Sequence, residues 1–152
     1  MKTRLQKFLA LDPERRRLFV QAWRLLGIMR FSISRKSFRD LVAGLKLHRE
    51  TVEQISLNPE SLATARRVGW AVQAAARYTP WSSTCLVQVL AAQRMLQQRQ
   101  IPGVFFLGAA TGDDPEQLQG LAAHAWLKCS NEFITGEAGH RRYTVISSFS
   151  WF

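Results

Sequence analysis

The spacing of hydrophobic residues changes along this chain, and that change restricts the folds it can form. Up to about residue 99, apolar side chains recur every three or four positions, as they do on one face of an α-helix. After residue 101 they form short runs and alternations that are typical of strands. Helices followed by a group of neighbouring strands predict an α+β fold with an antiparallel sheet.

Three helices are predicted in the first half of the chain. They cover residues 13–30, 37–47 and 60–78. Asp12 is the expected N-cap of the first, with Pro13 in its first turn. Asn58-Pro59 opens the third, and Thr79-Pro80 ends it because the residue before a proline is pushed out of the α region. Small residues follow one face of the third helix, which permits close packing.

After Pro80 the sequence predicts one more helix and then the sheet. The helix starts at Cys85, capped by Ser82 or Thr84, and runs to about Arg99. Strands are expected over residues 104–109, 122–129, 132–135 and 143–148, and a polar loop over 111–120. We therefore expect a Cys-bearing helix that packs on an antiparallel β-sheet.

Positive charge is concentrated in the front half of the chain. The protein has 21 Lys+Arg and 11 Asp+Glu, a formal net charge of +10. Residues 1–76 carry a net charge of +9, from 15 basic and six acidic residues, and residues 77–152 carry +1. We predict a basic helical N-terminal subdomain over 1–78 and a core over 79–152, integrated into one domain. The basic half is either a solvated helical face or a surface for an acidic partner, nucleic acid or anionic lipid.

Several protein classes are excluded by composition and motifs. A chain of 152 residues, 47% apolar and 21% charged, is globular rather than disordered. No Cys/His spacing fits a zinc site, and no phosphate-binding GxxxxGK[ST] loop occurs. The start lacks the pattern of a secretory signal, and the apolar stretch from Leu18 to Ile33 is interrupted by Arg24 and Arg30, so no membrane span is expected. A cytoplasmic protein with reduced thiols follows.

Cys85 and His124 are the residues best suited to catalysis. Cys85 begins a helix, where the macrodipole and the unbonded main-chain N–H groups stabilise a thiolate and can hold an oxyanion. His124 lies in a predicted strand between small residues, and a cysteine followed by a histidine on a sheet is the layout of cysteine nucleophiles. Each has an alternative reading, as a buried core thiol and as a structural histidine.

Other side chains complete the predicted site. A third group usually orients the histidine of such a site. The candidates lie on or after the predicted strand 132–135, which follows the His124 strand: Glu132 begins it, and Glu137 is the first acid after it. Cys129 lies five residues after His124, so strand alternation places it on the opposite face. Trp81 and Trp126 flank the two catalytic positions, and either wall a substrate groove or pack in the core.

Two segments of the chain resemble a known protein family. The first is the run Pro80 to Leu86 (PWSSTCL) with the helix that follows it, which contains Gln88 and Ala91-Ala92-Gln93-Arg94. The second is Ala123-His124-Ala125-Trp126. Together they resemble the transglutaminase-like cysteine peptidases of lasso-peptide biosynthesis, the leader peptidases that form the second half of a split B protein. The resemblance covers about residues 12 to 148. It implies a papain/transglutaminase-like core.

The resemblance assigns roles to particular residues. The family's Cys and His carry over to Cys85 and His124 as nucleophile and base. Independently of the resemblance, Ser83, Thr84, Trp81 and Trp126 are expected near the oxyanion site or substrate groove because they flank the two catalytic positions. The family usually has an Asp as its third catalytic residue, and this chain has Glu137 in that region.

The resemblance also implies a pathway. The substrate is a precursor peptide of leader plus core, a separate protein recognises the leader, and an asparagine-synthetase-like ATP-dependent cyclase closes the ring. No metal or organic cofactor is implied. The alternatives are transglutaminase- or amidase-type acyl transfer, and a basic non-enzymatic module that binds nucleic acid or anionic surfaces.

Overall fold

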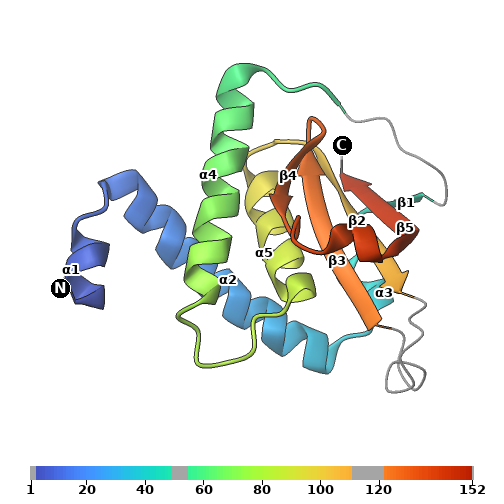
Figure 1. The fold of residues 1–152 in the computed structure, drawn as a ribbon, viewed down its shortest axis with the longest axis horizontal. Coiled ribbons are helices and arrows are strands. Elements are labelled where there is room, and N and C mark those ends of the chain that lie inside the picture. The colour runs from blue at the N-terminus through green and yellow to red at the C-terminus, as the bar shows by residue number, and fades with distance from the viewer. Residues whose placement is uncertain (1–2, 49–54, 111–121, 152) are drawn as a thin grey trace.

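A computed structural model describes residues 3–48, 55–110 and 122–151 of the chain (Figure 1). The elements follow in the order α1 (Arg4–Leu9), α2 (Pro13–Arg35), α3 (Phe38–Leu41), β1 (Lys46–His48), α4 (Pro59–Ala76), α5 (Cys85–Gln98), β2 (Gly103–Ala110), β3 (Ala122–Cys129), β4 (Glu132–Thr135), the 3-10 turn η1 (His140–Arg142) and β5 (Thr144–Trp151). The helices come first and the main strands last, so the predicted α+β class is confirmed.

Local capping explains where the three long helices begin. The carboxylate of Asp12 accepts from the Arg15 N–H at 2.8 Å at the start of α2. Asn58 caps α4 in the same way, and Thr84 caps α5 by accepting from the Val87 N–H at 3.4 Å. Each cap satisfies an N–H that has no partner inside the helix. Of the two predicted caps for α5, the structure therefore selects Thr84.

The predicted helix over residues 37–47 is wrong for most of its length. Only the four residues of α3 are helical, and residues 46–48 form β1, which pairs antiparallel with β5. Lys46 lies opposite Ser150 and His48 opposite Ser148. This pairing joins segments about a hundred residues apart, so local periodicity carries no sign of it.

Other differences between the predicted and the observed elements are local. The first helix continues to Arg35, the last strand covers Thr144–Trp151, and the short helix α1 was not predicted. The predicted loop over 111–120 lies outside the described residues.

The five strands form one antiparallel sheet in the order β1-β5-β2-β3-β4. Helix α5 packs against β2, β3 and β4, and α4 packs against β4 and α5. On β3, Ala125, Leu127 and Cys129 are buried in the core that these helices cover. Because neighbours on a strand alternate, His124 and Trp126 belong to the other face, as predicted for His124 relative to Cys129.

One hydrophobic core joins the helices to the sheet. Buried side chains from every major element belong to it, among them Leu26, Val72, Leu96, Phe105 and Leu127. The division at residue 78 stays a prediction. Among the described residues, no helix is sufficiently long and apolar for a membrane crossing.

Close packing of α4 on β4 fixes one wall of the site. A Cβ at Gly69 would lie 2.5 Å from the carbonyl oxygen of Ile134, so only a glycine allows this approach. One helical turn later, the side-chain amide of Gln73 donates to the same carbonyl at 2.8 Å. The end of β4 is thus held against the helix, and the chain after it is directed toward the first turn of α5.

Candidate active site

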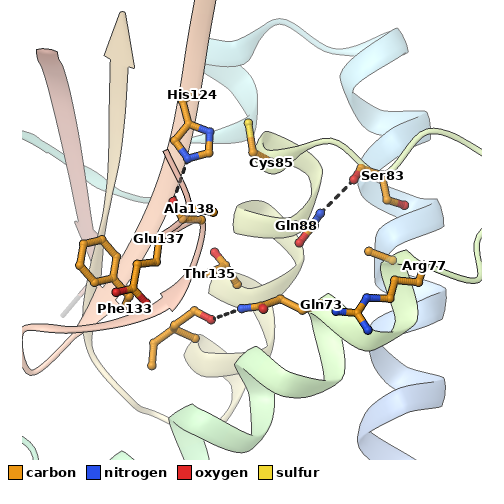
Figure 2. A pocket seen from close by; sticks show the side chains of 13 residues that line it. Gln73, Arg77, Ser83, Cys85, Gln88, His124, Phe133, Thr135, Glu137 and Ala138 are labelled. Carbon is orange, nitrogen blue, oxygen red and sulfur yellow. Dashed lines mark hydrogen bonds between the residues drawn. The ribbon is translucent and has the colours of Figure 1, made fainter. Parts of the chain in front are cut away.

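A cleft of about 650 Å³ opens where the C-terminal part of α4, the N-terminus of α5 and the end of β4 meet (Figure 2). Its walls are formed by Gln73, Ala76, Arg77, Ser83, Cys85, Gln88, His124 and residues 133–138. The two residues predicted to carry the chemistry therefore line the same cleft, although 39 positions separate them in the chain.

Cys85 is the first residue of α5, and its side chain is partly exposed. At this position the main-chain N–H groups of the first turn have no acceptor within the helix. They face the same end of the helix as the thiol and favour negative charge there. The preceding loop is fixed from within, since the Thr79 hydroxyl lies 2.8 Å from that of Ser83 and Gln88 donates to the Ser83 carbonyl at 3.0 Å.

The ring of His124 is held at one nitrogen by the main chain. Nε2 lies 2.8 Å from the carbonyl oxygen of Gly136. A carbonyl oxygen only accepts, so Nε2 carries the proton, and in the neutral ring Nδ1 carries the lone pair. In Figure 2 the Nδ1 edge of the ring faces the Cys85 thiol. That tautomer suits a base that takes the proton of the thiol.

Aromatic rings fix the orientation of His124 from two sides. Its ring stacks on Trp126, with ring centroids 5.7 Å apart, and lies 5.0 Å from the Tyr143 ring. Trp126 is 4% exposed and also stacks on Phe106. It supports the histidine from beneath and does not line the cleft.

Gly136 can place its carbonyl only because it has no side chain. Its φ is +80°, a conformation that L side chains rarely adopt. An added Cβ would collide with the main chain of β3 at Ala125 and Trp126. Gly136 was not anticipated from the sequence as a site residue. Its one local signal was a glycine directly after a strand, which also fits an ordinary turn.

Glu137 lines the cleft, but its side chain points toward Phe133 and away from His124 (Figure 2). The other acid considered, Glu132, pairs with Arg66 at 2.6 Å, and this hydrogen bond lowers the pKa of the Glu132 carboxyl. The catalytic role of Glu137 stays a prediction. In this geometry the hydrogen bond of the His124 ring is to the Gly136 carbonyl.

The four residues predicted near the oxyanion site or substrate groove lie in different places. Ser83 lines the cleft, and Thr84 caps α5. Trp81 packs against Trp23, with ring centroids 5.0 Å apart, and contributes to the core. Trp126 lies under His124.

Besides Gly136, further cleft residues with polar side chains were not anticipated from the sequence. They are Gln73, Arg77 and Thr135, from α4 and β4. The Thr135 hydroxyl is buried and has no partner within the described part of the chain. Sequence patterns do not distinguish such residues from ordinary helix and strand positions, because they reach the cleft only through the packing of α4 on β4.

The two thiols differ in their environments. Burial raises the pKa of Cys129 to about 12, and its side chain is fully buried. Iodoacetamide at pH 8 should therefore alkylate Cys85 and leave Cys129 unmodified in the folded protein, because the thiolate is the reacting form. Peptide mass mapping after brief labelling tests this. Equal labelling of both cysteines without unfolding would contradict the assignment of Cys85 as the accessible thiol.

Comparison with models of protein families gives a match for this chain. Residues 25–148 match the model of the transglutaminase-like superfamily, whose members are generally enzymes of the cysteine-protease type. The match covers most of the chain and includes Cys85 and His124, the two cleft residues predicted to carry the chemistry. No curated protein and no solved structure matches the chain.

Proposed function

The chain belongs to the transglutaminase-like superfamily, and on this premise we propose that it is a cysteine peptidase that removes the leader from a ribosomally made lasso-peptide precursor. The observation that supports this most directly is the single cleft in which Cys85 begins a helix and His124 has its Nε2 bound to the Gly136 carbonyl. The resemblance around Cys85 and His124 supplies the leader–core junction as the bond to be cleaved.

The proposed reaction has two steps. Nδ1 of His124 takes the thiol proton, and the Cys85 sulfur attacks the carbonyl carbon of the last leader residue. Main-chain N–H groups at the start of α5 stabilise the oxyanion. As the C–N bond breaks, His124 returns the proton to the amine of the core. Water then attacks the thioester with His124 as base, which releases the leader as a carboxylic acid and restores the thiol.

The proposal includes partners that this chain needs in the pathway. A separate leader-recognition protein would deliver the precursor, and an asparagine-synthetase-like ATP-dependent cyclase would use the amine that cleavage frees. Arg15, Arg16 and Arg17 on α2 belong to the basic front half. Such a surface suits recruitment of an acidic leader or delivery protein.

Mass spectrometry of the precursor incubated with the protein and its delivery partner tests the reaction class. Hydrolysis should give two fragments whose masses add up to the precursor plus one water. Prior alkylation of Cys85 should prevent their formation. A cross-linked product that has lost ammonia would instead assign acyl transfer to an amine, and an unchanged precursor under these conditions would contradict both.

A further inference from the structure

A second hollow lies on a neighbouring face of α4, where that helix meets α1 and the start of α2. Its volume is about 420 Å³, and four aromatic side chains line it: Phe8, Phe19, Trp70 and Tyr78. Phe19 connects them, with ring centroids 5.6 Å from Phe8 and 6.1 Å from Tyr78. Leu5 at this hollow is 66% exposed and Tyr78 is 44% exposed. Exposed apolar side chains around a concave surface are typical of a binding site.

This hollow, called the α4 groove below, shares the last turns of α4 with the catalytic cleft. Gln73 and Arg77 line the cleft, whereas Trp70, Ala74 and Tyr78 line the α4 groove. Gln73 and Ala74 are consecutive, so only the surface of one helix separates the two. A helix is about 10 Å across with its side chains, and an extended peptide covers about 3.3 Å per residue. Three or four residues of a bound peptide therefore span from one to the other.

The charged groups at the α4 groove are all cationic. Arg4 and Lys7 line it, and none of the described residues that line it is acidic. The Arg4 guanidinium lies over the Tyr78 ring, 5.3 Å from its centroid, and that of Arg15 over the Trp70 ring at 5.4 Å. Arg15 also pairs with the Asp12 carboxylate at 3.6 Å. An arginine stacked on an aromatic ring, such as Arg4, keeps its N–H groups available to carboxylates at the rim. An apolar floor with a cationic rim complements an apolar side chain flanked by acidic residues.

We propose that the α4 groove is an exosite for the peptide substrate. It binds an apolar side chain, flanked by acidic residues, in a segment a few residues away from the cleaved bond. The proposal rests on the peptidase function for the identity of the peptide. The charge complementarity and the shared helix turn favour a segment of the substrate as the occupant. Such an exosite adds affinity without contact to the reacting atoms, because a second site on one chain raises the effective concentration at the first.

Fluorescence anisotropy with synthetic probes tests the groove directly. The probe is a fluorescein-labelled peptide of Glu residues around a central Phe-Leu pair, mixed with the Cys85→Ala protein to prevent cleavage. Replacing Phe-Leu with Ser-Ser, or every Glu with Lys, should weaken binding about tenfold or more. Equal binding of all three peptides would overturn the proposal.

Groove variants locate the binding site. Ala74→Arg places a long side chain in the groove and should weaken binding of the acidic probe about tenfold. The pair Arg4→Glu and Lys7→Glu should also weaken it and reduce its salt dependence. The matched control, Lys36→Glu with Arg39→Glu, makes the same charge change at exposed positions outside the groove. Undiminished binding by Ala74→Arg, or an equal loss in the control, would refute the assignment.

Kinetics separate the exosite from the proposed function. In an otherwise wild-type chain, Ala74→Arg should raise KM for the full precursor about tenfold and leave kcat unchanged, since only binding is affected. Alkylation of Cys85 at the wild-type rate shows that this variant is folded. Probe binding without precursor cleavage would refute the peptidase alone, and cleavage with an unchanged KM would refute the exosite alone. A concentration-dependent dimer that Ala74→Arg abolishes would assign the groove to a second copy and overturn the proposal.

Discussion

Replacing Cys85 with alanine should lower kcat for precursor cleavage about a thousandfold or more, which is the scale on which loss of a catalytic nucleophile acts. Among the described residues that line the cleft, no other side chain can form the acyl intermediate in the same place, because the Cys85 thiol lies at the N-terminal end of α5, where first-turn N–H groups have no acceptor within the helix. Discontinuous cleavage assays with mass detection measure the effect. Circular dichroism should be unchanged, since a partly exposed side chain is shortened.

Cys129→Ala is the matched control for this prediction. The same substitution at a fully buried thiol on β3 removes a core contact and should lower the free energy of unfolding by about 1 kcal/mol. Cleavage at 25 °C should remain within about twofold of wild type, because such a loss leaves the protein folded. Persistent cleavage by Cys85→Ala, or its loss only in Cys129→Ala, would contradict the assignment of the nucleophile.

Much of the fold was predictable because its signals are local. The caps at Asp12, Asn58 and Thr84 and the helical spacing after each are short-range features, and the residue alternation of β3 matches its observed bounds. β1 was missed because its strand character comes from pairing with β5, far along the chain. The helical spacing that predicted a helix over residues 37–47 is overridden at residues 46–48 by the pairing with β5.

In the candidate site, too, the residues with local signals were predictable and those placed by distant contacts were not. Cys85 and His124 were singled out because a thiol and an imidazole are side chains suited to nucleophilic catalysis, and their contexts, a helix start and a strand, are visible in the sequence. The group that holds His124 was not, because it is a main-chain carbonyl and every residue has one. A carboxylate was expected instead, and Glu137, the first acid after the strand that follows the His124 strand, is adjacent to Gly136 in the chain.

Gly136→Ala should lower kcat/KM about a hundredfold by moving the carbonyl that binds His124 Nε2. The φ of +80° disfavours alanine, and the new Cβ would collide with the main chain of β3. The 135–137 segment must then shift, and displacement of a catalytic group by about 1 Å costs on this scale. In ¹⁵N NMR spectra, His124 should lose the Nε2–H tautomer that the Gly136 carbonyl favours in the wild type, an effect that a change in stability alone does not produce.

Two matched variants decide which group orients His124. Gly139→Ala has nearly the same φ, +78°, with no atom within 4 Å of the added Cβ, so it tests the backbone conformation without the collision. It should cost about 1 kcal/mol of stability and leave cleavage within about threefold of wild type. Glu137→Gln removes the nearby carboxylate while the Gly136 carbonyl stays, and should have a similarly small effect. If Glu137→Gln instead matches the loss in Gly136→Ala, the carboxylate moves to His124 during the reaction and the main-chain carbonyl is only its resting contact. A loss of cleavage confined to Gly136→Ala means that a backbone carbonyl orients His124, the role for which the resemblance implies an Asp.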